Sequence, residues 1–238
     1  MLSGESLPDW KTVLSILYEL GAAPDVIARL KDLHKVADAS TSSISFVPDL
    51  SAEYLRLRLD EIEAVRERTL NPTGLPGPLQ TKGYAEFAAR QARRRVPEGW
   101  PEVAGDERNE RKALLTRDVN PLRLESVIAE SALRVLDGLP RDDRNEQLDV
   151  LISTAEQGLA DFFIRPFDRG PYGAYQLTLL SFPEDDEPDS AYLDTRLGLA
   201  IVDDADTVNV LRAEWCDARD EAMTPPESIA FLKKMKTG

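Results

Sequence analysis

The fold is decided by residues 121–183, which read PLRLESVIAESALRVLDGLPRDDRNEQLDVLISTAEQGLADFFIRPFDRGPYGAYQLTLLSFP. LRLESVIAES, residues 122–131, alternates apolar and polar side chains, which is typical of a strand. QLDVLISTA has helical spacing, and ADFFIRPF and AYQLTLLSFP are two more strand-like runs on either side of a GPYG turn. We therefore predict an α+β domain, with a central mixed or antiparallel sheet of about five strands packed with helices.

The C-terminal part of the chain continues this pattern. SAYLDTRLGLAIVDD, residues 190–204, predicts two short strands. The run that follows predicts a helix with an inward face of Val208, Leu211, Trp215 and Ala218. TPPE, residues 224–227, has the spacing of a capping box and predicts the start of a last helix.

The N-terminal part predicts a separate helical unit. Apolar residues recur at helical spacing over residues 1–38 and indicate a helical hairpin, and the polar residues 39–50 read as a linker to the α+β domain at 51–238. Within that domain a long helix is predicted from Ser51 to about Arg68. NPTGLPGPLQT, residues 71–81, is rich in Pro and Gly and predicts an irregular segment on the surface or along a cleft wall.

Composition excludes several classes of protein. The 238 residues are 42% hydrophobic, enough for a sizeable core, and the net charge of −14 opposes binding to nucleic acid or to an anionic membrane. No apolar run reaches the roughly 18 residues of a membrane span. The single cysteine, Cys216, excludes an internal disulfide and favours a reducing compartment, so we expect a cytoplasmic protein.

Motifs for catalysis or metal binding are not evident. The lone His34 has no Ser or Cys matched to it, and neither zinc-ligand spacing nor a glycine-rich phosphate loop is present. The sequence therefore predicts no metal and no cofactor.

Two carboxylates in the segment that decides the fold are candidate general acid/base groups. Glu125 falls on one face of the predicted strand with Val127, and Glu130 lies where strand passes into helix. A carboxylate among apolar neighbours would have a raised pKa and could transfer a proton or bind an amine. Alternatively, Glu130 simply interacts with a helix N-terminus, where the dipole favours an acidic residue.

Aromatic residues and one arginine are candidate ligand-binding groups. Trp100 lies in VPEGWPEVAG, residues 96–105, an irregular segment that predicts either a pocket wall or a plug for the core. Arg165, Tyr172 and Tyr175 could converge across the GPYG turn, and Tyr192 is polar on a later strand. The alternative is that these side chains only pack a strand edge and a hairpin.

The order of LPGPLQTKGYAEF, RNERKALL, LESVIAESALRVLDG, QLDVLISTA, FFIRPFDRGPYGAYQLTLLSFP and TPPESIAFL resembles the C-terminal domain of actinobacterial Xre-type helix-turn-helix regulators, the WhiJ-like, antitoxin-like group. LPDWKTVLSILYELG resembles the last part of that family's DNA-binding bundle. Pro78 stands where the family loop has Leu, and RNERKALL lacks the family's Gln. The resemblance implies a cytoplasmic sensing or partner-binding domain, and we expect its DNA-binding head to be truncated here.

Two functions follow as hypotheses. The first is a regulator-derived effector module that binds a small molecule or a small basic partner protein, without independent DNA binding, and a homodimer is a candidate assembly for it. The second is an enzyme of specialised metabolism on the same scaffold, with Glu125 or Glu130 as general acid/base on an aromatic amine or similar cyclising substrate.

Overall fold

The computed structural model contains two compact units, Met1–Leu59 and Asp60–Gly238. The residues that it describes are 10–23, 26–27, 30–31, 34, 51–91, 99–170, 175–183, 188–195 and 197–237. In the first unit, helix α1 (Trp10–Glu19) has no buried residue, and the ring of Trp10 meets that of His34 edge-on with 5.4 Å between centroids. The predicted linker, 39–50, lies outside the described residues. Helix α3 (Ala52–Glu63) spans the boundary between the units.

The α+β prediction is confirmed, with one strand more than expected. Among the described residues, six strands form one mixed sheet in the order β3-β2-β1-β4-β5-β6. Strands β1, β2 and β3 are parallel neighbours, whereas β4, β5 and β6 continue the sheet antiparallel. The strands are β1 (Arg66–Asn71), β2 (Arg123–Ala129), β3 (Ala160–Arg165), β4 (Gln176–Ser181), β5 (Ser190–Thr195) and β6 (Gly198–Val202).

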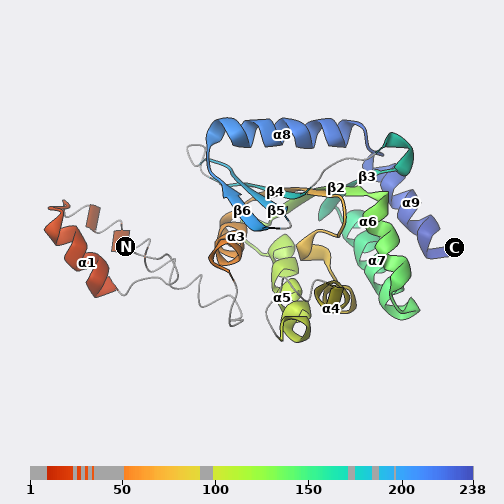
Figure 1. Ribbon diagram of the computed structural model, residues 1–238, viewed down its shortest axis with the longest axis horizontal. Coiled ribbons are helices and arrows are strands. Elements are labelled where there is room, and N and C mark those ends of the chain that lie inside the picture. Colours follow the sequence, from red (N-terminus) through yellow and green to blue (C-terminus); the bar gives the residue numbers. More distant parts are fainter. Residues whose placement is uncertain are drawn as a thin grey trace. The chain divides into compact units, whose positions relative to one another are not determined.

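Helices cover both faces of this sheet. Figure 1 shows α8 along one face and α4, α5, α6 and α7 on the other, while α9 packs against α7 and β3. The helices are α4 (Lys82–Gln91), α5 (Trp100–Ala113), α6 (Glu130–Arg134), α7 (Arg141–Glu156), α8 (Ala205–Asp220) and α9 (Pro225–Thr237). Short 3₁₀ turns are η1 (Gly77–Leu79), η2 (Leu114–Thr116), η3 (Val135–Gly138) and η4 (Phe167–Arg169).

The central strand β1 was missed by the sequence prediction. A single helix was expected to run to about Arg68, but α3 ends at Glu63 and β1 begins at Arg66. RERTLN has the charge of a surface helix, and its strand character comes from its place between β2 and β4, where ladder hydrogen bonds and burial on both faces outweigh local propensity.

Two further expectations were wrong, and a third is narrowed. The runs before and after the GPYG turn do not form a hairpin, because β2 and β1 lie between β3 and β4. The segment 71–81 was expected on the surface or along a cleft wall, and its burial excludes the first of these two positions. Trp100 is not in an irregular segment but is the first residue of α5, with 6% of its surface exposed.

The core between α8 and the sheet is as predicted. Val208, Leu211, Trp215 and Ala218 are buried against Leu70 and Val127 of the central strands, and the indole Nε1 of Trp215 donates a hydrogen bond to the carbonyl of Thr69 at 3.1 Å. One half of the predicted capping box also forms, the half made by the Glu227 side chain, while the Thr224 hydroxyl donates to the same carboxylate at 2.7 Å. The backbone N–H of Thr224 donates to Glu227 Oε2 at 2.8 Å, and the hydrogen bonds from Thr224 lower the pKa of Glu227.

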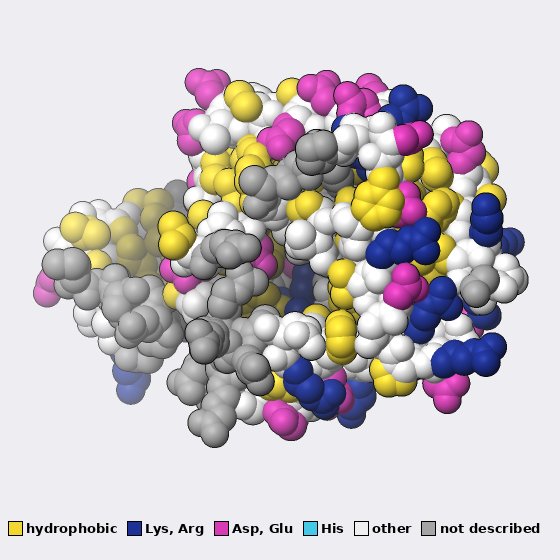
Figure 2. Space-filling model, turned by 45° about the vertical axis from the view of Figure 1, so that its right-hand side comes forward, with side chains coloured by type: hydrophobic (Ala, Val, Ile, Leu, Met, Phe, Trp, Pro, Cys, Tyr) yellow, Lys and Arg dark blue, Asp and Glu magenta, His cyan; other side chains and the backbone are white. Residues whose placement is uncertain are grey.

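The molecular surface mixes the two signs of charge. Figure 2 shows Lys and Arg side chains interspersed with Asp and Glu on the right-hand part of its face. Several of the cations on α6 and α9 have acidic partners, as in the pairs Lys233–Glu156 at 2.6 Å and Arg134–Glu130 at 3.0 Å. Exposed pairs of this kind contribute little to stability, but they reduce the positive potential that a phosphate backbone would need.

Truncating Trp215 to Ala should lower the free energy of unfolding by about 3–5 kcal/mol, because it leaves a cavity between α8 and the sheet. Urea unfolding measures the change. Val210 on the same helix is 67% exposed, and its change to Ala should stay within about 0.5 kcal/mol. Equal losses for the two variants would contradict this account of the core.

Candidate functional site

Polar side chains from β1 and β2 meet in the interior, on the sheet face opposite α8. Leu70 faces α8, so its neighbours Thr69 and Asn71 point the other way, and the strand register places Thr69 beside Ser126. Thr69 Oγ1 donates to Ser126 Oγ at 2.9 Å, and Asn71 Nδ2 donates to Thr69 Oγ1 at 2.6 Å and to Ser126 Oγ at 2.8 Å. All of these side chains are at most 1% exposed.

One atom of this cluster has no hydrogen-bond partner among the described residues, the side-chain carbonyl Oδ1 of Asn71. Rotating the amide would not remove the defect, because one end of the amide faces both hydroxyls and the other end would still lack a partner. A buried polar atom left unsatisfied costs about 1–3 kcal/mol. Asn71 ends β1, so it lies at the C-terminal edge of the parallel strands, where ligands bind in open α/β sheets.

The buried segment after Asn71 is held by side chains from two helices. The N–H of Leu75 donates to Tyr84 Oη at 3.1 Å. Gln147 of α7 accepts from the N–H of Thr81 and donates to the carbonyl of Leu79, both at 2.8 Å. These contacts replace the water that a surface loop would use for its backbone groups. Residues 72–81 are therefore held in one conformation next to Asn71, and we call this segment the wall. Burial raises the pKa of Tyr84 to about 12.

A buried ion pair lies under the same segment. The guanidinium of Arg111 on α5 binds both carboxylate oxygens of Glu61, with Nη2 2.6 Å from Oε1 and Nε 2.9 Å from Oε2. Arg111 is 5% exposed and Glu61 is fully buried. A Cβ atom on Gly77 would lie 2.0 Å from Arg111 Nη1, so the guanidinium packs directly on the backbone of that glycine.

Arg108, one turn before Arg111, connects Trp100 to the segment 71–81. Its guanidinium lies 5.9 Å from the centre of the Trp100 ring, its Nε donates to Gln80 Oε1 at 2.9 Å, and it is paired with Glu107. Gln80 in turn donates to the carbonyl of Leu75 at 2.8 Å. Trp100 therefore supports the wall through Arg108.

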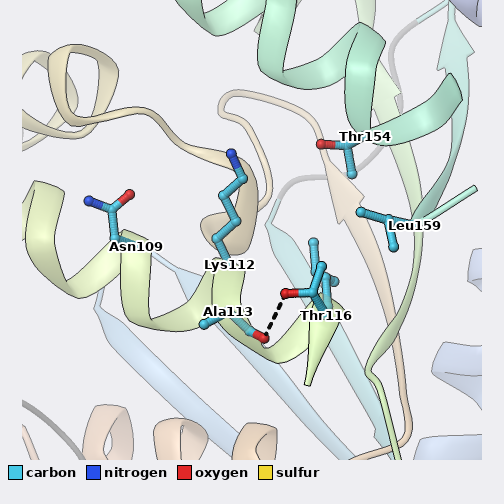
Figure 3. A pocket seen from close by; sticks show the side chains of 7 residues that line it. Asn109, Lys112, Ala113, Thr116, Thr154 and Leu159 are labelled. Atoms are coloured by element: carbon cyan, nitrogen blue, oxygen red, sulfur yellow. Dashed lines mark hydrogen bonds between the residues drawn. The ribbon is translucent and has the colours of Figure 1, made fainter. Parts of the chain in front are cut away.

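A pocket of about 270 Å³ lies elsewhere, between the C-terminal ends of α5 and α7 (Figure 3). Leu159, which immediately precedes β3, lines it, so the pocket is at the N-terminal edge of the parallel strands. It is thus at the opposite end of these strands from Asn71.

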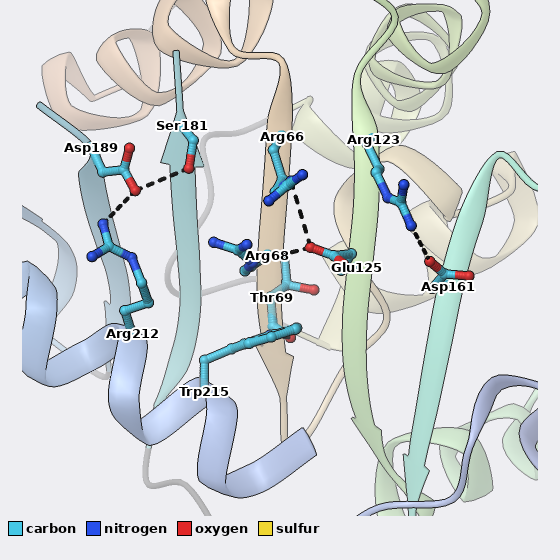
Figure 4. A network of polar contacts seen from close by, with 10 residues as sticks. All are labelled: Arg66, Arg68, Thr69, Arg123, Glu125, Asp161, Ser181, Asp189, Arg212 and Trp215. Atoms are coloured by element: carbon cyan, nitrogen blue, oxygen red, sulfur yellow. Dashed lines mark hydrogen bonds and ion pairs between the residues drawn. The ribbon is translucent and has the colours of Figure 1, made fainter. Parts of the chain in front are cut away.

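Glu125, a predicted catalytic residue, lies on the α8 face and has arginine partners (Figure 4). Its Oε2 accepts from Arg68 Nε at 3.0 Å and lies 3.8 Å from Arg66 Nε. The guanidinium of Arg68 also stacks 5.4 Å from the centre of the Trp215 ring. Glu125 was predicted to have apolar neighbours, but its carboxylate forms ion pairs with two arginines. These ion pairs connect β2 to β1.

Glu130, the second predicted catalytic residue, is the first residue of α6. It accepts hydrogen bonds from Arg134 Nη2 at 3.0 Å and from the backbone N–H of Phe167 at 3.2 Å. Its contacts join the end of β2 to the turn after β3, which favours the structural alternative.

Arg165 and the tyrosines have separate partners. Arg165 closes the turn after β3 by donating to the carbonyl of Gly170 at 2.6 Å, and it pairs with Glu221 at 2.6 Å. Tyr175 Oη donates to Glu214 at 2.5 Å, and burial together with that carboxylate raises the pKa of Tyr175 to about 12.

Tyr192 is buried on the opposite face of the sheet and donates to Asp60. Tyr172 lies outside the described residues. The structure therefore does not gather the predicted residues into one cleft: Glu125, Arg165 and Tyr175 lie on the α8 face with different partners, whereas Tyr192 and Trp100 belong to the other layer.

Sequence reasoning missed the interior cluster. Its signal was the alternation of Glu67, Thr69 and Asn71 along β1, which is visible only once RERTLN is recognised as a strand. Within the described part of the chain, no group of three or more His, Cys, Asp or Glu side chains is placed to hold a metal ion. No helix of that part is long and apolar enough to cross a bilayer.

Comparison with known protein families assigns most of the chain to one of them. The profile of the DUF5753 family, described as a domain of unknown function, matches residues 55–234. No curated protein and no solved structure matches the chain.

Replacing Arg111 by Gln should lower the free energy of unfolding by about 3–5 kcal/mol, because it removes the buried guanidinium that binds both carboxylate oxygens of Glu61. The exposed pair Arg123–Asp161 is the matched control, and Arg123→Gln should cost no more than about 1 kcal/mol. Urea unfolding compares the two. Similar costs would show that the buried pair does not hold this wall.

Tyr84 should make stability fall at alkaline pH. The folded state keeps a proton that the unfolded chain, with a tyrosine pKa of about 10, releases between pH 10 and about pH 12. Two pKa units at 1.36 kcal/mol each give a loss of at most about 2.7 kcal/mol. In Tyr84→Phe this contribution should vanish, so the difference in unfolding free energy between the two proteins should shrink over that range. A difference in unfolding free energy that stays constant from pH 10 to pH 12 would contradict the raised pKa of Tyr84.

Proposed function

The chain belongs to the DUF5753 family, and we propose that it is an effector module that binds a small molecule at Asn71. The proposed module derives from an Xre-type regulator of the WhiJ-like, antitoxin-like group and does not bind DNA on its own. The resemblance of the sequence to that group supports the regulatory part of the proposal, and the interior cluster supports the binding part.

The observation that carries the proposal is the buried side-chain carbonyl oxygen of Asn71, Oδ1, which has no hydrogen-bond partner among the described residues. The Asn71 side chain is fully buried, and its Nδ2 donates hydrogen bonds to two hydroxyls while its Oδ1 has no such partner in that part of the chain. An unsatisfied buried atom costs the folded state about 1–3 kcal/mol, and a ligand that hydrogen-bonds to it would remove that cost. An amide end offers an acceptor in one orientation and a donor in the other, so it suits a small ligand with an amine, amide or hydroxyl group.

The surrounding wall supports the same proposal. The segment after Asn71 is fixed by Tyr84 and Gln147, and Arg111 lies against Gly77. A wall that is ordered before binding loses little conformational entropy on binding, which raises affinity. The position at the C-terminal edge of parallel strands is also the usual place for a ligand in such sheets.

The enzyme hypothesis has no comparable contact in its favour. Glu125 and Glu130 each accept hydrogen bonds from arginine, and those contacts join elements of the fold. A small basic partner protein is compatible with the net charge of −14, but charge alone names no binding surface. We therefore rank small-molecule binding first.

Thermal-shift screening of the full chain against small polar metabolites tests the proposal. A ligand at a hundred times its Kd adds about 2.7 kcal/mol, which raises Tm by roughly 5–11 °C for a protein of this size. The shift should be lost in Asn71→Leu and kept in the matched control Asn209→Leu, because Asn209 is exposed on α8. Circular dichroism checks that both variants are folded. A ligand that stabilises Asn71→Leu as much as the wild type would refute the site.

A further inference from the structure

The pocket between α5 and α7 has an apolar interior with polar groups on its walls. Its lining comes from the last turns of α5, the 3₁₀ turn η2, the last turns of α7 and the residue before β3. These residues are Asn109, Lys112, Ala113, Leu115, Thr116, Thr154 and Leu159. Most of the exposed lining is carbon, so the pocket favours a ligand with an apolar body.

Two of the polar groups face this space. Thr154 is 4% exposed as a residue, and its hydroxyl is not one of the buried side-chain atoms that lack a hydrogen-bond partner, because it borders the open pocket. The ammonium of Lys112 has no ion pair within the described residues. Figure 3 shows the Lys112 ammonium and the Thr154 hydroxyl reaching into the space between α5 and α7 from opposite sides.

The two groups differ in what they would gain from a ligand. Lys112 lies in the last turn of α5, where the helix dipole favours a cation whether or not a ligand is present. The Thr154 hydroxyl faces the open pocket, so a ligand that accepts a hydrogen bond there would take the place of water. Thr116 differs, since its hydroxyl already donates to the carbonyl of Ala113 at 3.4 Å.

We propose that this pocket binds a small monocarboxylate with an apolar body, whose carboxylate is held by the Lys112 ammonium and the Thr154 hydroxyl. One ammonium and one hydroxyl can donate to the two oxygens of a single carboxylate. A phosphate dianion is disfavoured, because one cation would face two charges in a protein with a net charge of −14. The volume of about 270 Å³ is near the lower end of ligand pockets, which restricts the body to a single ring or a short chain.

This site is independent of the one proposed at Asn71. Asn71 ends β1, whereas the pocket adjoins the residue that precedes β3, so the two lie at opposite edges of the parallel strands. The expected ligands differ as well. The Asn71 site offers a neutral amide, whereas the pocket offers the ammonium of Lys112 to a carboxylate. Either site can therefore be disproved without the other.

Titration of the isotope-labelled full chain with benzoate, followed by amide NMR, tests the proposal. Saturable shifts should concentrate in residues 109–116 and 154–159. Benzamide has the same shape without the charge, and acetate has the charge without the body. Each should bind at least tenfold more weakly than benzoate.

Lys112→Met should weaken benzoate binding on the order of tenfold, while Lys234→Met, the same charge change on the exposed face of α9, should leave it unchanged. Thr154→Val should also weaken binding, without loss of stability, because the hydroxyl it removes faces the open pocket. Asn71→Leu should bind benzoate like the wild type. Equal benzoate affinity in Lys112→Met and the wild type, equal binding of benzamide and benzoate, or a marked loss of stability in Thr154→Val would each overturn the proposal.

Discussion

Strand β1 carries charged and polar side chains into the middle of the sheet, and both layers of the protein depend on how these are satisfied. On the α8 face, Arg68 pairs with Glu125 and stacks on Trp215, whose indole N–H binds the carbonyl of Thr69. On the other face, Thr69 and Asn71 bond to Ser126. A purely apolar central strand would pack without such partners, so the polar sequence of β1 requires specific neighbours on β2 and α8.

The buried segment that follows β1 extends the same constraint. Because most of this segment is buried, its backbone polar groups need protein partners, and Tyr84 and Gln147 provide several of them from α4 and α7. The ion pair of Arg111 with Glu61 fixes α5 beneath it. Replacing such a pair by apolar residues is often neutral or stabilising, so its presence is better explained by fixing one arrangement of the wall than by adding stability.

The two proposed sites use different chemistry at opposite edges of the parallel strands. At Asn71 the protein offers a neutral amide in a buried interior, which suits recognition by hydrogen bonds. Between α5 and α7 it offers an apolar hollow with one cation and one hydroxyl. Helix α5 carries both Arg111, which contacts the first wall, and Lys112, which lines the second pocket.

The sequence by itself determined the local structure wherever one periodicity dominates. It identified β2, α7, the inward face of α8 and the capping box at Thr224, and it placed Glu125 and Val127 on the same face of β2. It did not identify β1, since RERTLN becomes a strand only through its neighbours β2 and β4. Nor did it bring Asn71 to Ser126, 55 residues away in sequence, because hydrogen bonds between distant side chains depend on strand order and register. Short-range spacing sets which face of an element is apolar, but the pairing of elements is decided by burial and backbone hydrogen bonding across the whole domain. Only the tertiary structure could therefore show which polar residues are left without partners.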